Sequence, residues 1–170
     1  KKRYLAMHAW DDLEAFYSES AKWDELIRVL EREAENPSAT TETKISLYSK
    51  IAQLWAERKE KTDRAAKYLE KTLELDANNR DAALRLAPIY HAANDSKKLA
   101  GVLEVKANGD LPEERVATLR DLGALYEGPL KDAAKAFERY QEAFRLDPEA
   151  PGSVTDLERS ADLASRWADA

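Results

Sequence analysis

The residues that could do chemistry in this chain are two histidines, a loop with calcium-type spacing and many carboxylates. His8 and His91 are its two histidines, and neither has a second ligand at metal-binding spacing. We therefore interpret both as helix-surface residues. The segment Asp76-x-Asn78-x-Arg80 has the alternating polar residues of a calcium loop, but Asp81 stands where glycine is needed and Ala87 where a bidentate glutamate is needed. A turn between two helices is the better interpretation.

Paired carboxylates such as Asp11-Asp12 and Glu113-Glu114 are of the type that general acid–base catalysis uses. Charged residues make up 35% of the chain, however, so adjacent carboxylates are expected on solvated helix surfaces. The sequence contains no phosphate-binding glycine loop, no HExxH zinc motif and no GxSxG nucleophile motif. It also contains no cysteine, which excludes disulfides and thiolate chemistry. These observations predict a protein that is not an enzyme and that uses no metal or cofactor.

Charge and hydropathy narrow the range of partners. The formal net charge of −6 disfavours nucleic acid as a partner, because protein surfaces that bind nucleic acid are basic. No apolar run approaches the roughly 20 residues of a membrane span, so membrane insertion is not expected. The chain opens with Lys1-Lys2-Arg3 and lacks an initial methionine and a signal-peptide pattern. We expect a fragment or a processed product, whose compartment stays open with the cytoplasm favoured.

The elements that position these residues are predicted to be helices. Alanine, leucine, glutamate, lysine and arginine dominate, and glycine occurs only five times. Apolar periodicity and turn residues predict helices over 6–19, 22–35, 41–58, 62–76, 80–93, 96–107, 112–127, 131–146 and 152–164, with the start of a tenth after them.

One apolar pattern returns about every 36 residues. Its clearest copy consists of Leu119, Leu122, Gly123 and Tyr126, followed by Ala136, Tyr140, Ala143 and Pro148. Ile51 precedes Leu122 by 71 residues, whereas Leu13 precedes Leu86 by 73, so two types of unit alternate. Leucine and tyrosine four residues apart share one helix face, and Gly123 is expected to let the following helix approach closely. Bulky side chains such as Trp55 and Tyr90 are expected to fill the space between helices.

This pattern resembles the tetratricopeptide repeat (TPR), whose consensus is W-x-x-L-G-x-x-Y, then A-x-x-x-F, then P. The resemblance covers nearly the whole chain. The chain is similar to a segment of the long arrays in large bacterial TPR proteins. It implies an all-α fold, a right-handed α-solenoid of stacked antiparallel helix pairs. We expect one solenoid over residues 1–170, with four repeats and a truncated fifth at about 5–37, 41–79, 80–110, 112–149 and 151–170.

The resemblance also implies a concave groove lined by the first helix of each pair. Carried onto this chain, the candidate peptide-binding residues are Ser49, Gln53, Glu57, Leu84, Pro88, His91, Arg120 and Glu127, with Arg159 in the fifth unit. Chaperone-binding TPR domains hold a peptide carboxylate with a clamp whose key residue is asparagine. Here the matching positions are Ala15, Gln53, Pro88 and Ala124, so that clamp is absent.

Pro88 departs most from the repeat pattern. In mid-helix it removes one hydrogen-bond donor and crowds the carbonyl of Leu84, which favours a kink. Its ring is expected to face the groove beside His91. The kink either changes only the local curvature or contributes to a ligand site.

The sequence therefore predicts a non-catalytic protein-interaction module that binds a peptide or extended segment on its concave face. The alternative is a structural spacer or assembly element that self-associates through its terminal repeats, within a larger multi-repeat protein. A third possibility is regulation of an enzyme domain elsewhere in the parent chain. The identity of the partner does not follow from the sequence.

Overall fold

The computed structural model describes residues 10–19 and 22–165, and the regular secondary structure within these residues is entirely helical. The chain divides into two compact units, one up to Ala77 and one from Asn78 onward. The N-terminal unit contains α2 (Trp10–Ser18), α3 (Trp23–Ala34), α4 (Thr41–Glu57) and α5 (Thr62–Leu75). The C-terminal unit contains α6 (Arg80–Ala92), α7 (Ser96–Gly109), α8 (Pro112–Glu127), α9 (Ala133–Leu146) and α10 (Ser153–Ala164).

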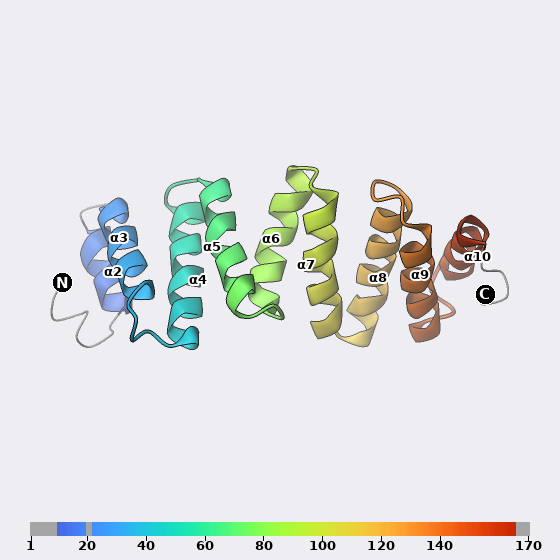
Figure 1. The fold of residues 1–170 in the computed structure, drawn as a ribbon, viewed down its shortest axis with the longest axis horizontal. Coiled ribbons are helices and arrows are strands. Elements are labelled where there is room, and N and C mark those ends of the chain that lie inside the picture. Colours follow the sequence, from blue (N-terminus) through green and yellow to red (C-terminus); the bar gives the residue numbers. More distant parts are fainter. Residues whose placement is uncertain (1–9, 20–21, 166–170) are drawn as a thin grey trace. The chain divides into compact units, whose positions relative to one another are not determined.

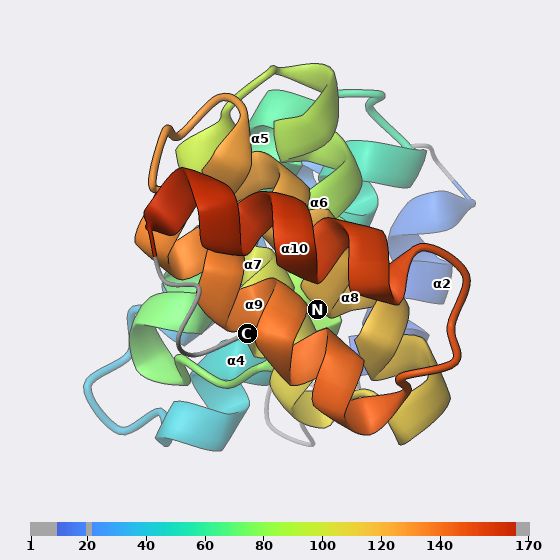
Figure 2. The same cartoon turned by 90° about the vertical axis from the view of Figure 1, so that its right-hand side faces the viewer.

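Helices that follow one another in the chain pack side by side within each unit (Figure 1). In the C-terminal unit, α7 packs against α8, and α9 packs against both α8 and α10. Figure 2 shows α10 lying across the end of this unit beside α9. Within each unit, one helix pair thus covers an apolar face of the next pair, as a repeat protein requires. The single solenoid over both units stays a prediction.

The repeat residues form the core, as predicted. Ile51 and Leu122 are fully buried, and Trp55 and Tyr90 are less than one-tenth exposed. A Cβ atom on Gly123 would lie 2.7 Å from Cε1 of Tyr140, so α8 and α9 approach more closely there than an alanine would allow. The predicted role of Gly123 is therefore confirmed.

The turns inside the pairs alternate in length and match the two unit types predicted from sequence. In every pair, the N–H of the residue before the second helix donates to the carbonyl of an aromatic residue near the end of the first helix. The span is five residues in the first and third pairs and six in the second and fourth. The bonds are Lys22 to Tyr17 (3.0 Å), Asp95 to Tyr90 (3.0 Å), Lys61 to Trp55 (2.8 Å) and Asp132 to Tyr126 (2.7 Å).

Two predicted helix ends are wrong by two residues. Helix α9 begins at Ala133 because Lys131 has a left-handed backbone (φ 53°) and Asp132 accepts a hydrogen bond from the Lys135 N–H at 3.1 Å, as an N-cap does. Helix α7 continues through Asn108 to Gly109 instead of ending at residue 107. Three predictions lie outside the described residues: residues 6–9 of the first predicted helix, the position of His8 and the predicted tenth helix.

Asp110, directly after α7, ties three helices together. Its side chain is fully buried and accepts hydrogen bonds from Arg80 Nη2 (2.5 Å) on α6, Lys106 Nζ (2.6 Å) on α7 and Thr118 Oγ1 (2.7 Å) on α8. Burial alone would raise the pKa of this carboxyl, but the three donors outweigh burial and lower the pKa from 3.8 to about 2. The charged carboxylate is therefore the form that holds this corner of the C-terminal unit.

Candidate functional site

One face of α8 carries the candidate site of the C-terminal unit. Ala117, Arg120, Asp121 and Ala124 recur at the spacing of a single helix face. Three surface hollows adjoin along this face: the first two share Asp121 and Ala124, and the second and third share Ala117 and Arg120. Because these side chains are small or charged, the face stays open between the flanking helices. The three adjoining hollows are together called the depression along α8.

The first depression, here called the apolar hollow, has a volume of about 480 Å³. It is lined by Ala87, Pro88 and His91 of α6, Leu99 and Leu103 of α7, and Asp121, Ala124 and Leu125 of α8. The leucines of α7 reach it because α7 packs against both α6 and α8. The volume falls in the range of about 300–1,000 Å³ that ligand pockets occupy.

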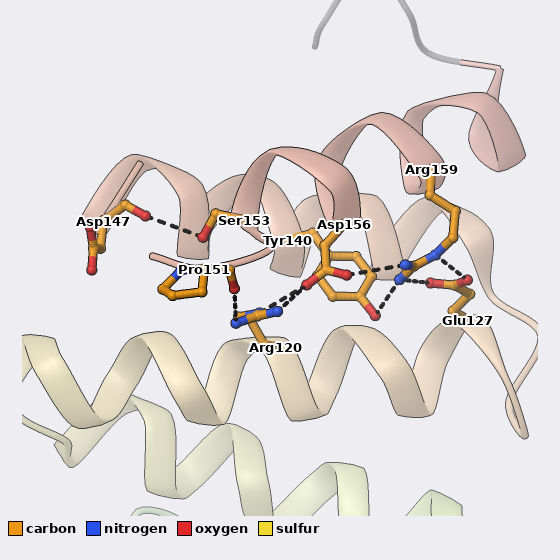
Figure 3. Close-up of polar contacts among 8 residues, drawn as sticks. All are labelled: Arg120, Glu127, Tyr140, Asp147, Pro151, Ser153, Asp156 and Arg159. Carbon is orange, nitrogen blue, oxygen red and sulfur yellow. Dashed lines mark hydrogen bonds and ion pairs between the residues drawn. The ribbon is translucent and has the colours of Figure 1, made fainter. Parts of the chain in front are cut away.

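The second depression, here called the polar hollow, has a volume of about 410 Å³. It is lined by Ala117, Arg120, Asp121 and Ala124 of α8, Tyr140 of α9, and Asp156 and Arg159 of α10. Figure 3 shows that the arginines approach from opposite sides, Arg120 from α8 and Arg159 from α10.

Ion pairs across the polar hollow join α8 to α10. Arg120 Nε donates to Asp156 Oδ2 at 2.8 Å, and Arg120 Nη1 donates to the Pro151 carbonyl at 2.9 Å. Arg159 makes a two-pronged contact with Glu127, at 2.8 and 2.9 Å, and its Nη1 lies 3.1 Å from Asp156 Oδ1. The guanidinium groups therefore already have carboxylate partners in this structure (Figure 3).

Tyr140 forms the floor of the polar hollow and stays neutral. Burial, helped by the negative charge of Glu127, raises the pKa of Tyr140 to about 12. Its hydroxyl oxygen accepts a hydrogen bond from Arg159 Nη2 at 3.2 Å. The hydrogen bond to Glu127 raises the pKa of Arg159 above its ordinary value. Tyr140 therefore stays protonated and Arg159 stays charged throughout the physiological pH range.

A left-handed glycine makes room for the Arg120 contacts. Gly152 precedes α10 with φ +83°, and a Cβ atom there would lie 2.9 Å from Arg120 Nη2. A side chain at this position would be strained and would collide with the guanidinium group. The turn into α10 is therefore built to accept Arg120.

The third depression has a volume of about 380 Å³ and lies where α8 begins and α9 ends. It is lined by Pro112, Glu113, Val116, Ala117, Arg120, Leu146, Asp147 and Ala150. Leu146 is 44% exposed beside it.

The residues predicted for the groove fall into three groups: those at the hollows of the C-terminal unit, Leu84 outside the hollows, and those on α4 of the N-terminal unit. In the C-terminal unit, Pro88 and His91 line the apolar hollow, Arg120 lines the polar hollow and Glu127 pairs with Arg159. Leu84 is half-buried on α6 and lines none of the three hollows described above.

In the N-terminal unit, the predicted residues all lie on α4. Gln53 donates its amide to both Glu57 carboxylate oxygens at 3.1 and 3.2 Å, whereas Ser49 is half-buried. All four positions at which a carboxylate clamp would carry asparagine are exposed side chains: Ala15, Gln53, Pro88 and Ala124.

Sequence reasoning missed Asp121, Tyr140 and Asp156 as site residues. A signal for Asp156 was present, because it follows Arg120 by 36 residues, which is one repeat. Opposite charges at one repeat spacing on first helices predict an ion pair between neighbouring repeats. No comparable signal marks Asp121.

Residues 10–19 and 22–165 carry neither a metal-type cluster nor a membrane-type helix. In this part of the chain, no three histidine, aspartate or glutamate side chains are grouped as a metal ion would need. None of the helices there combines the length and the apolar character of a membrane span.

The comparisons with known proteins bear on the fold and not on the hollows. A tetratricopeptide-repeat family model matches residues 9–38. No curated protein sequence matches the chain significantly. A crystal structure of MamA shares 14% identity and a TM-score of 0.51, with 95% of this chain and 84% of that chain covered. PilF of Pseudomonas aeruginosa shares 19% identity over 99% of this chain and 72% of that chain, with a TM-score of 0.45.

The fold and the helix pairs define an all-α repeat protein, and the predicted fold class is confirmed. The chain resembles tetratricopeptide-repeat proteins through the family match over residues 9–38, and repeats of this kind serve in general as protein-interaction modules without catalysis of their own.

Proposed function

We propose that the chain binds an extended protein segment along the depression over α6, α8 and α10. The observation that supports this most strongly is the shared lining of the three hollows. Because each hollow shares residues of α8 with the next, a segment crossing α8 could place successive side chains in neighbouring hollows. A small compact ligand would use one hollow and leave the others empty. The predicted α4 residues Ser49, Gln53 and Glu57 belong to the N-terminal unit and are proposed, by themselves, as a second binding surface.

The test replaces Ala124, which is exposed and lines both the apolar and the polar hollow. Ala124→Arg should fill both hollows while keeping a good helix former in α8. Ala134→Arg is the matched control, because Ala134 is exposed on α9 and lines none of the three hollows. In quantitative affinity capture, the wild type and Ala134→Arg should retain the same partners, and Ala124→Arg should lose them. Equal capture by all three proteins would refute the proposal.

A second candidate function is assembly through the outer helices. Phe16 on α2 is 49% exposed, and Val154 and Leu163 on α10 are 50% and 55% exposed. Such side chains favour contact with another chain when they belong to a larger apolar patch. Light scattering at rising protein concentration distinguishes the two functions. A mass that stays that of one chain at every concentration would rule out self-association.

A further inference from the structure

The apolar hollow has one carboxylate at its rim, and that carboxylate has no counter-charge. Asp121 is exposed and makes no ion pair or hydrogen bond with any other residue that the structure describes. Apart from His91, which is neutral in the formal count, the other side chains lining this hollow are apolar. The hollow therefore combines an apolar floor with a single negative charge.

The polar hollow cannot neutralise this charge. Arg120 is paired with Asp156 at 2.7 Å, and Arg159 is paired with both Glu127 and Asp156. The three carboxylates Asp121, Glu127 and Asp156 thus outnumber the two guanidinium groups by one. A ligand that matches this face supplies one positive charge at Asp121.

The position of Asp121 also fixes where that charge must be. Asp121 and Ala124 line both hollows, so they lie on the boundary between the apolar and the polar hollow. A segment that buries an apolar side chain between Pro88 and Leu103 reaches Asp121 with its adjacent side chain. The apolar side chain and the positively charged side chain therefore belong to neighbouring residues of the bound segment.

We infer that this site recognises a protein segment in which a large apolar side chain is followed or preceded closely by lysine or arginine. This inference rests on the proposed function and adds the chemistry of the partner. The apolar side chain enters the hollow formed by α6, α7 and α8, where Leu99 and Leu103 replace water around it. The basic side chain pairs with Asp121. Segments with an acidic residue at that position are rejected, because two carboxylates would meet.

The apolar anchor carries most of the affinity and the basic residue most of the selectivity. Truncating a buried leucine or phenylalanine of the segment to alanine should weaken binding about 10- to 100-fold. Removing the charge of Asp121 should weaken it only about 2- to 5-fold, since exposed ion pairs are weak. The second effect should fall as salt is added.

The experiment selects binders from a randomised peptide library displayed on phage, with the intact chain as bait. The inference predicts enrichment of an apolar residue next to lysine or arginine. Selection on Asp121→Lys should replace that basic residue with an acidic one. Glu158→Gln and Asp121→Asn form a matched pair for binding titrations, because both remove one exposed carboxylate and Glu158 lines none of the three hollows.

The outcomes separate this inference from the function on which it rests. Peptides that lose binding to Ala124→Arg but show no basic preference, or whose preference is unchanged by Asp121→Lys, would overturn the inference and leave the proposed function standing. Peptides that bind Ala124→Arg as well as the wild type would overturn both. A charge preference that reverses with Asp121→Lys would establish the inference, because loss of folding cannot reverse a preference.

Discussion

Replacing Asp110 with asparagine should destabilise the C-terminal unit in a manner that depends on pH. The carboxylate is fully buried and receives hydrogen bonds from Arg80, Lys106 and Thr118. An asparagine has the same shape but no charge, so the two cations lose their shared partner. Arg80 and Lys106 are 41% and 26% exposed, and water therefore relieves part of the loss.

The pKa of Asp110 sets the size and the sign of this effect. The three donors lower the pKa from 3.8 to about 2 in spite of burial, so the folded state prefers the charged form. A lowering of this size is worth about 2 kcal/mol of unfolding free energy, which is fully present above the unfolded pKa. It is lost progressively as pH falls from 3.8 towards 2.

The assay is urea unfolding of the wild type and Asp110→Asn, monitored by circular dichroism from neutral pH down to the acid range. The variant should be less stable by about 2 kcal/mol at neutral pH, and the difference should shrink below about 1 kcal/mol near the folded pKa. Asp81→Asn is the control, because Asp81 makes only an exposed pair with Arg85 and should cost less than about 0.5 kcal/mol. A difference between wild type and Asp110→Asn that does not change with pH would refute the reasoning.

Four further substitutions test the packing and the site. Gly123→Ala should lower the unfolding free energy by about 1–3 kcal/mol because its Cβ would meet Tyr140, whereas Gly101→Ala, with open space around it, should raise stability by about 0.5–1 kcal/mol in the same thermal unfolding assay. Leu122→Ala should cost about 2–5 kcal/mol by urea unfolding, since Leu122 is fully buried; a cost below 1 kcal/mol would contradict its core position. Pro88→Ala should raise stability by about 1–3 kcal/mol and change the affinity for selected peptides, and higher stability with unchanged affinity would remove Pro88 from the site.

Much of the fold could be predicted because the repeat residues and turn residues mark the same boundaries. The two types of unit predicted from the sequence also differ in the turn inside the pair, because the hydrogen bond of Lys61 spans six residues and that of Asp95 spans five. The start of α9 was not predictable, because lysine gives no sequence signal for the left-handed conformation that Lys131 adopts. Helix α7 runs past its predicted end at residue 107, because the backbone leaves the helical conformation only at Asp110, which is extended.

The sequence could predict which helix face carries the candidate site, but not the shape of the site. The resemblance located Pro88, His91 and Arg120 on first helices, and the structure finds each of them at a hollow. The resemblance itself did not indicate that Asp156 holds Arg120, although the opposite charges one repeat apart are a signal for that ion pair. The contact of Arg120 with the Pro151 carbonyl could not be predicted, because it depends on the turn at Gly152. Nor could the resemblance indicate the apolar hollow, because Leu99 and Leu103, which line it, lie on α7, the second helix of the pair.

The most direct test of the central claim is photo-crosslinking from the α8 face. A photoreactive amino acid is introduced at Ala124, in the apolar and polar hollows, or at Ala134 on α9, and each protein is irradiated with a library-selected peptide. Binding along the depression predicts a covalent adduct from position 124 and none from position 134. Adducts from position 134 alone, or equally from both positions, would contradict the account.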